Sequence, residues 1–412
     1  MLDPRDLDPA IGGQPFFARR GASGALTELL LGTGGSVQDL TGVPGAANNT
    51  ITVIVGNTAG TVNWGPQCVY TPNDTDNDGF VARFDGTDCL WIVGIGGVGS
   101  DRADVTMSAV TALSSGNVVV GGTVDGTMTM IDGVLPRPTL TSSGRDGFFA
   151  MLDAAGDTLG TVRAVSGALM MEQHVRALTT IKDTAGNEHI MVGGTSIGDV
   201  AVDGGTPLGL PSISTSSWVA HYNATLATPP HVALLSGGPA AADRVEVRAL
   251  SATSQPGEVA VAGSFNGPFR SWSSQGQDAF VVRYSLNLTE IANSDVQILG
   301  TGGEEIWGAA PVATGYALAI SSDSNPLSFS RGGQDVNGLG SGSAVIVSFN
   351  VSDGSRRNAR ILTGDTFLPK GLGLGNDGSL RAALSFTNTL LVDTTSVTAA
   401  AGKDIAVLVV AP

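Results

Sequence analysis

Short runs of alternating apolar and polar residues occur along most of the chain, and one of them recurs. In residues 78–85, D-G-F-V-A-R-F-D, the alternation places Phe80, Ala82 and Phe84 on one face of a strand, and Val81 and Arg83 on the other. Similar runs stand at 146–153, 216–223, 278–285 and 343–350, with truncated copies at 15–20 and 403–410. The pattern predicts an all-β repeat protein.

Three further runs follow each copy of this opening run. An apolar run ending in glycine comes first, then a segment such as V-T-A-L (110–113), then a fourth run such as N-V-V-V-G-G (117–122). The glycines that end the apolar run recur about every 65 residues, at Gly35, Gly97, Gly167, Gly238, Gly303 and Gly364. A four-stranded sheet cannot bury both of its apolar faces alone, whereas neighbouring sheets in a ring bury them all.

The repeat therefore predicts a β-propeller of six four-stranded blades, each of about 65 residues. The single propeller domain is expected over residues 15–412, after an N-terminal extension at 1–14. Opening-run copies near both ends suggest closure of the ring by N- and C-terminal strands, although the N-terminal copy is surplus and has no assigned partner. Residues 168–178 also fit a short amphipathic helix, but their alignment with strands of the other units favours a strand.

Residues 78–123 combine D-x-F-V-A-R-x-D, an apolar run to Gly-Gly, and S-S-G-N-V-V-V-G-G-T. In this combination the chain resembles the bacterial β-propeller repeat (SBBP) of secreted and surface proteins, over residues from about 15 to 410. The resemblance implies an extracellular or cell-surface location, with a leader absent from this chain. It implies no shared chemistry, and the family name implies seven blades where this chain offers six.

Charge and hydropathy exclude two classes of partner. The chain has 21 basic and 37 acidic residues, a net charge of −16, which repels nucleic acids and anionic membrane surfaces. No apolar run approaches the roughly 18 residues of a membrane-spanning helix, so no membrane insertion is expected.

Strands in a propeller blade run alternately up and down, so alternate loops lie at the same end of the sheets. This order predicts at which end a ligand would bind. Tight turns such as 85–88 and 114–117 fall at one end of the sheets. The other end receives the segments 124–145, 196–216, 265–277 and 323–342, here called the long-connection face. Loops held by a rigid scaffold commonly carry binding sites, so a protein or glycan ligand is expected on this face.

An acidic residue follows the terminal glycine of each unit within five positions, and in a ring these residues would gather near the channel mouth. The carboxylates could hold a cation or a basic partner, or each could accept backbone N–H groups in its own turn. The ligand-face candidates are Asp39, Asp101, Glu172, Asp243, Glu304, Glu305 and Asp365.

One motif suggests a metal. Asp74, Asp76 and Asp78, followed by Gly79, match the opening of a calcium-binding loop, in which alternating carboxylates surround the ion. The match ends at the ninth position, Ala82. Ca²⁺ is therefore the candidate cofactor, with a solvated Asp/Asn turn as the alternative.

Cysteine, histidine and tryptophan add little chemistry. Cys68 and Cys89 could form a disulfide, but they are expected at opposite ends of a blade, roughly 20 Å apart, so a bridge would need the segment 58–70 to fold back. No catalytic histidine or serine motif occurs. His221 stands at a repeat position and is expected to be structural, and His174 is the histidine nearest to a candidate acid. The remaining aromatic candidates, which could stack on sugars or fill gaps between blades, are Trp64, Trp272 and Trp307.

Three functions remain open. A non-enzymatic binding or adhesion module is favoured, because the scaffold is regular and no catalytic constellation occurs. A glycan hydrolase or lyase would need paired carboxylates at the channel mouth. A structural subunit of a surface assembly or fibre would expose an apolar patch or an unpaired edge strand.

Overall fold

The computed structural model describes residues 16–20, 26–43, 51–72, 76–97, 103–131, 138–167, 171–210, 213–227, 230–240, 242–331, 335–339, 343–374, 380–392 and 395–410. All regular elements in these ranges are strands, which confirms the predicted all-β class. No helix that could span a membrane occurs in the described ranges. The predicted N-terminal extension at 1–14 lies outside them.

The chain divides into two compact units. Unit 1 comprises residues 1–180, 196–210 and 228–230, and unit 2 comprises residues 181–195, 211–227 and 231–412.

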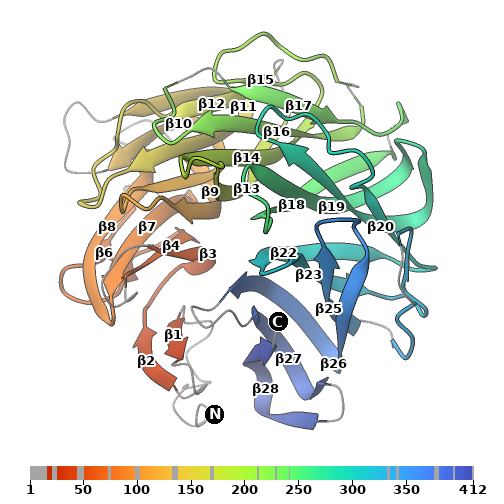
Figure 1. Cartoon of the computed structure of the whole chain (residues 1–412). Helices are drawn as coiled ribbons and strands as arrows, with labels where there is room; N and C mark the ends of the chain where they lie inside the picture. Colours follow the sequence, from red (N-terminus) through yellow and green to blue (C-terminus); the bar gives the residue numbers. More distant parts are fainter. Residues whose placement is uncertain are drawn as a thin grey trace. The chain divides into compact units, whose positions relative to one another are not determined.

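Unit 1 contains two groups of four antiparallel strands, each paired in chain order (Figure 1). The first group is β3 (Ser36–Gly42), β4 (Ile51–Thr58), β7 (Asp78–Asp85) and β8 (Asp88–Gly96). The second is β9 (Ala103–Ala112), β10 (Val118–Ile131), β11 (Thr139–Leu152) and β12 (Arg163–Ser166). Shorter elements are β1 (Phe16–Arg20), β2 (Leu26–Leu31), β5 (Val62–Asn63), β6 (Val69–Tyr70) and β15 (Ala201–Val202).

The surplus N-terminal run, left without a partner in the sequence analysis, forms β1 and pairs with β2. Of the segment 168–178, expected as a strand, residues 173–178 lie in β13 (Gln173–Lys182), and residues 168–170 lie outside the described residues. β13 ends in unit 2, where the following strand β14 (Glu188–Ile197) mostly belongs.

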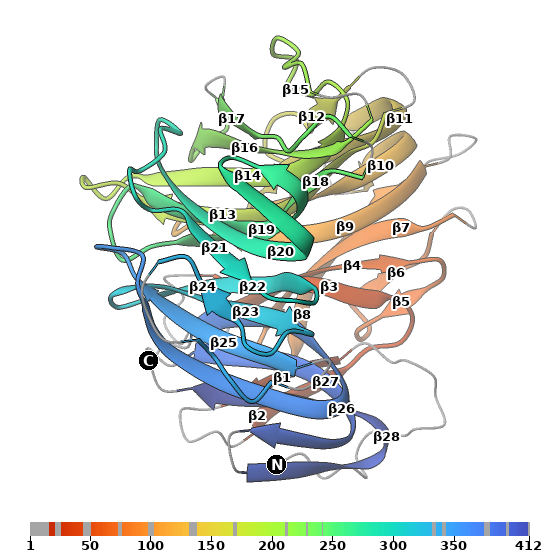
Figure 2. The same ribbon diagram turned by 90° about the vertical axis from the view of Figure 1, so that its right-hand side faces the viewer.

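Unit 2 repeats the same antiparallel order (Figure 2). One group is β18 (Arg244–Ala252), β19 (Glu258–Phe269), β20 (Trp272–Ser285) and β21 (Val296–Leu299). The next is β22 (Glu304–Val312), β23 (Gly315–Ser322), β25 (Ser343–Asn350) and β26 (Arg356–Leu374). β26 continues to β27 (Leu380–Val392) and β28 (Thr395–Val410), and the other strands are β16 (Thr215–Asn223), β17 (His231–Leu235) and β24 (Ser328–Phe329).

The alternation in β7 separates two parts of the core, as the sequence predicts. Phe80 and Phe84 pack in a cluster with Ile54 and Trp64, whereas Val81 belongs to the larger cluster that includes residues of β9, β10 and β11. Both faces of the strand are therefore buried. A sheet with two apolar faces needs a neighbour on each side, which is why one such sheet cannot form the domain alone.

A β-bulge recurs between the first and second strands of the four-stranded groups. The extra residues on the first strand are Gln38, Ser108, Arg248 and Trp307. β26 has the same kind of bulge at Lys370, where it pairs with β27. In three groups a glycine of the second strand faces the bulge. A Cβ on Gly56 would lie 2.3 Å from the Ser36 carbonyl oxygen, one on Gly122 would lie 2.1 Å from that of Thr106, and one on Gly263 would lie 2.0 Å from that of Glu246. The close approach of the bulged backbone explains why these runs end in glycine.

The connections between second and third strands are more regular than expected. Residues 124–145 and 265–277 were predicted as long loops, but most of them extend the hairpins β10–β11 and β19–β20. The connections also pair with the last strand of the preceding group: Thr129–Ile131 with Gly94–Gly96, β15 with β12, and β24 with β21. Backbone groups that an irregular loop would leave to solvent are thereby hydrogen-bonded.

Candidate functional site

Asp39, the first of the predicted acids, links the first strands of two neighbouring groups. Its Oδ2 accepts a hydrogen bond from the Val110 amide of β9 at 2.9 Å, and its Oδ1 accepts one from Leu40 at 2.8 Å. Burial raises the pKa of Asp39 to about 6, although both hydrogen bonds favour the ionised form. The carboxylate thus links the backbones of β3 and β9, the first strands of the two groups.

Glu172 lies half exposed beside an arginine and a histidine. Its Oε1 is 3.7 Å from Arg145 Nη1, and its Oε2 is 3.5 Å from His174 Nε2. The other ring nitrogen of His174 lies 2.8 Å from the Thr123 hydroxyl. Burial, reinforced by the positive charge of Arg176, lowers the pKa of His174 to about 4. His174 is therefore neutral near pH 7 and poorly matched to general-base catalysis there.

Two of the unit 2 acids have local partners. Asp243 is buried, and its Oδ2 accepts the Ala240 amide of its own turn at 2.9 Å. Glu305 lies 3.1 Å from Arg248 Nη2, and the same guanidinium contacts Glu246 at 2.5 Å. The bulge residue Arg248 thus joins the first strands of two groups, β18 and β22, by an ion-pair network.

Glu304 and Asp278 form an enclosed acidic pair. Their residues are 0% and 2% exposed. Glu304 Oε1 accepts hydrogen bonds from the hydroxyls of Ser322, at 3.1 Å, and Ser324. Burial raises the pKa of Glu304 to about 7 and also raises that of Asp278. A glycosidase needs two carboxyl groups that flank a bound sugar, and solvent does not reach either group of this pair.

The side chains of two predicted acids lie outside the described part of the structure. Asp101 lies outside the described residues. Asp365 lies on β26, where only its backbone is described.

The predicted calcium loop is described only in part. Asp76 lies in a bend, Asp78 begins β7, and Asp74 lies outside the described residues. Asp78 is fully buried and its Oδ2 accepts a hydrogen bond from the Tyr70 hydroxyl. Among the described residues no three His, Cys, Asp or Glu side chains are grouped to hold a metal. With one of the three predicted ligands undescribed, calcium binding stays a prediction.

Cys68 and Cys89 are not separated by the length of a blade, because the alternative in which the segment 58–70 folds back is the one observed. The two cysteines form a disulfide, with their Cα atoms 6.0 Å apart. The β5–β6 hairpin folds back so that Cys68 is buried in the cluster on one face of β7, beside Trp64. The contact between these side chains depends on the path of a connection, which strand lengths alone do not reveal.

The three candidate tryptophans are occupied by contacts within the protein. Trp64 is buried and meets Phe84 edge-on at 5.6 Å between ring centroids. Trp272 packs against Phe269 at 5.7 Å. The indole N–H of Trp307 donates to the Ser321 hydroxyl at 2.8 Å. These contacts agree better with gap filling than with an open stacking platform for sugars.

His221 belongs to a ladder of polar side chains across β14, β16 and β17. Its Nε2 is 3.0 Å from His189 Nδ1, and His189 Nε2 is 3.4 Å from an oxygen of Asp183. The His231 ring stacks on the other side, with centroids 6.0 Å apart. Burial and the two neighbouring imidazoles lower the pKa of His221 to about 4. The His221 imidazole is therefore neutral near pH 7.

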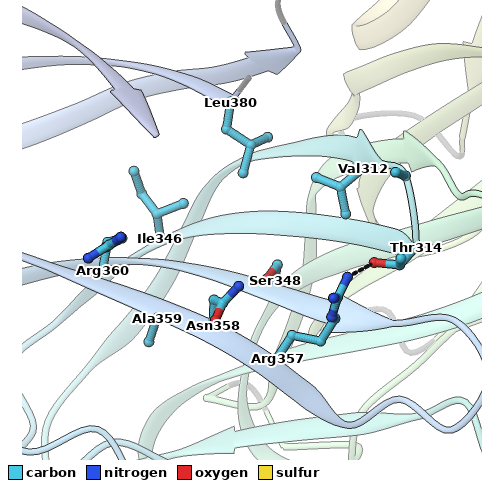
Figure 3. Close-up of a pocket in the computed structure, with 10 residues that line it drawn as sticks. Val312, Thr314, Ile346, Ser348, Arg357, Asn358, Ala359, Arg360 and Leu380 are labelled. Atoms are coloured by element: carbon cyan, nitrogen blue, oxygen red, sulfur yellow. Dashed lines mark hydrogen bonds between the residues drawn. The ribbon is translucent and has the colours of Figure 1, made fainter. Parts of the chain in front are cut away.

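A pocket of about 270 Å³ lies in unit 2, and none of its described lining residues is a predicted site residue (Figure 3). It is at the end of the sheet that carries the turns β22–β23 and β25–β26, opposite to the connection 323–342. The lining residues are Val312, Ala313, Thr314, Ile346, Ser348, Arg357, Asn358, Ala359, Arg360 and Leu380. The signal in the sequence is R-R-N-A-R at 356–360, three arginines within five residues of a strongly acidic chain.

Comparison of the chain with known protein families and with curated proteins returned no match.

Proposed function

We propose that the chain is a non-enzymatic extracellular binding module, built on a six-bladed β-propeller, that binds a protein or glycan through the long-connection face. Support for the propeller comes from the recurring four-stranded order and from the first strands. Within unit 1, Asp39 joins β3 to β9. Within unit 2, Arg248 joins β18 to β22. First strands that lie beside one another are the arrangement that a ring of blades requires.

The anchoring of four connections to the sheets, three of them by pairing with the preceding group, is the observation that carries the proposal. Main-chain hydrogen bonds hold three connections at β8, β12 and β21, and the Cys68–Cys89 disulfide holds a fourth. A surface that is ordered before it meets a ligand pays less conformational entropy on binding. The connections differ in sequence while their anchoring is alike, a combination suited to recognition on a constant scaffold.

The disulfide also supports the proposed extracellular location. Disulfides persist in oxidising compartments and are rare where thiol reductants are abundant. Enclosure of the Asp278–Glu304 pair favours binding over glycan hydrolysis, because a substrate has no path to these carboxyls.

Binding arrays of glycans and of cell-surface proteins test the proposal. Exposed residues of one connection at a time are replaced by glycine and serine, and matched replacements in the 85–88 turn serve as the control. Loss of binding in a connection variant, with the turn variant unaffected, is the expected result. Turnover of a bound glycan that depends on the ligand-face acids, or binding unaffected by all connection variants, would overturn it.

A crystal structure of the whole chain tests the propeller itself. Six sheets around one axis are expected, and two separate sandwiches would contradict the proposal.

Calcium is proposed as a stabilising ion at Asp74, Asp76 and Asp78. Thermal unfolding with 1 equivalent and with excess Ca²⁺, against a chelator, measures this directly. The expected result is a higher Tm with Ca²⁺ that is lost in Asp76→Asn. The same Tm in calcium and chelator would dispose of the site.

A further inference from the structure

The pocket of unit 2 joins an apolar floor to a cationic rim. Val312, Ile346 and Leu380 are buried and form the floor. Arg357 and Arg360 are exposed and stand at the rim. Figure 3 shows these side chains around one space, with the floor residues contributed by β22, β25 and β27 and both arginines by β26.

Charge makes this pocket unusual in the chain. The protein carries a net charge of −16, yet the pocket is lined by two guanidinium groups and by no carboxylate among its described lining residues. The remaining polar lining consists of Thr314, Ser348 and Asn358, which can donate hydrogen bonds. Guanidinium groups attract anions, so the two arginines favour an anionic ligand at this rim.

A β-bulge places one of the two arginines. The register of β25 with β26 shifts between Ser348 and Phe349, so that Arg357 is the extra residue between Arg356 and Asn358. Bulges re-aim a side chain relative to the regular alternation of a strand. Here the Arg357 guanidinium reaches the β22–β23 turn, where Nη1 donates to the Thr314 hydroxyl (Figure 3). This contact fixes the guanidinium at the rim. An arginine has four further N–H bonds, which can donate hydrogen bonds to a ligand.

We propose that this pocket binds a small organic carboxylate with an apolar body. The carboxylate would accept hydrogen bonds from the planar guanidinium forks of Arg357 and Arg360, whose geometry matches a carboxylate. The apolar body would cover Val312, Ile346 and Leu380 and remove their remaining surface from water. A volume of about 270 Å³ equals that of roughly nine water molecules, which suits a ligand of about ten non-hydrogen atoms.

This site is separate from the proposed long-connection face. Ala313 and Thr314 form the turn between β22 and β23, and Arg357 follows the turn between β25 and β26. Strands in this sheet are antiparallel, so both turns lie at the end opposite to the connection 323–342. Failure of either proposal leaves the other unaffected.

Isothermal titration calorimetry of the full chain with phenylacetate, benzoate and hexanoate tests the proposal. Phenylacetamide is the neutral counterpart of phenylacetate, and inorganic phosphate is an anion without an apolar body. The expected result is saturable binding of at least one carboxylate, at least tenfold tighter than phenylacetamide and phosphate.

Single variants locate the site. Arg357→Gln and Arg360→Gln are each expected to weaken carboxylate binding about tenfold or more. Arg356→Gln is the matched control: it removes the same charge from the same strand, but its guanidinium lies over the Phe329 ring, 5.6 Å from the centroid, and does not line the pocket. Less than a twofold change is expected there. Arg357→Lys keeps the charge without the fork and is expected to fall between the wild type and Arg357→Gln.

Four results would overturn the proposal. The first is no binding of any of the three carboxylates at 10 mM, roughly the weakest affinity of interest. The second and third are binding of phenylacetamide as tight as that of phenylacetate, and binding of phosphate tighter than that of the carboxylates. The fourth is an equal loss of carboxylate affinity in Arg356→Gln and Arg357→Gln. Circular dichroism melts of each variant establish that it is folded, and Ser348→Phe, which fills the pocket without a change of charge, provides an independent variant expected to abolish binding.

Discussion

Removal of the Cys68–Cys89 disulfide should loosen one connection and leave the rest of the protein intact. The bond joins residues 21 apart in sequence. For a loop of this length, the loss of chain entropy in the unfolded state corresponds to about 3.3 kcal/mol at 25 °C. If the whole chain of 412 residues unfolds together, this lowers the Tm by about 4 °C. A local measurement is more sensitive, because the effect is concentrated in the β5–β6 hairpin.

The assay is amide hydrogen exchange followed by mass spectrometry on the Cys68→Ala/Cys89→Ala variant. Peptides that cover residues 59–72 should exchange up to roughly 250-fold faster, since 3.3 kcal/mol corresponds to about 2.4 powers of ten. Peptides from β18 and β19 should be unchanged and serve as the internal control. Dithiothreitol should reproduce the effect in the wild type and add nothing in the variant.

Unchanged exchange of residues 59–72 in both the variant and the reduced wild type would refute the reasoning. That result would mean that the buried contacts of Trp64 and Tyr70 hold the hairpin without the covalent link.

Three further changes test the packing. The buried Glu304 carboxyl has a pKa raised to about 7. Between pH 4.5 and 7 it therefore holds a proton in the native state that an unfolded glutamate has lost. The free energy of unfolding should fall as pH rises through this range, by up to roughly 3 kcal/mol. Denaturant titrations at pH 5 and 8 should show this difference in the wild type and a smaller one in Glu304→Gln, and identical profiles would contradict it. Glu258→Gln should lower the free energy of unfolding by about 3 kcal/mol. The Arg283 side chain is 4% exposed, and the substitution removes the carboxylate that lies 2.7 Å from its guanidinium. A loss below about 0.5 kcal/mol in urea unfolding would show that the pair is not buried in solution. Gly122→Ala should destabilise by at least about 2 kcal/mol, because its Cβ would meet a carbonyl oxygen at 2.1 Å, whereas Gly60→Ala, with nothing within 4 Å, should be nearly neutral by the same titration.

Strand positions and faces were accessible from the sequence because they depend on local alternation. The run at 78–85 forms β7 with the predicted division of faces. The segments V-T-A-L, N-V-V-V-G-G and D-G-F-F-A-M-L-D also lie on consecutive paired strands, β9, β10 and β11. A side chain that points up or down from a pleated strand is set by its own position in the run, so periodicity alone is sufficient.

Chemistry-bearing contacts were not accessible in the same way. The calcium motif and the acids after each glycine were found by residue type, but burial decides what a carboxyl group can do. Glu304 and Glu305 are neighbours in sequence, yet Glu304 is enclosed with Asp278 while Glu305 pairs with Arg248. Alternation predicts opposite directions for the two side chains, and only the surrounding sheets determine which direction is buried.

By itself, then, the sequence determined the all-β class and the strand segments, since each follows from patterns within about ten residues. The tertiary structure decided the disulfide, the enclosed acidic pair and the arginine-rimmed pocket. Each of these joins residues that the sequence keeps apart: Cys68 meets Cys89 through a folded-back hairpin, and Arg357 meets Thr314 through a bulge that shifts the register by one residue. Such contacts depend on the path of connections and on the register between strands, which hydrophobic periodicity does not encode.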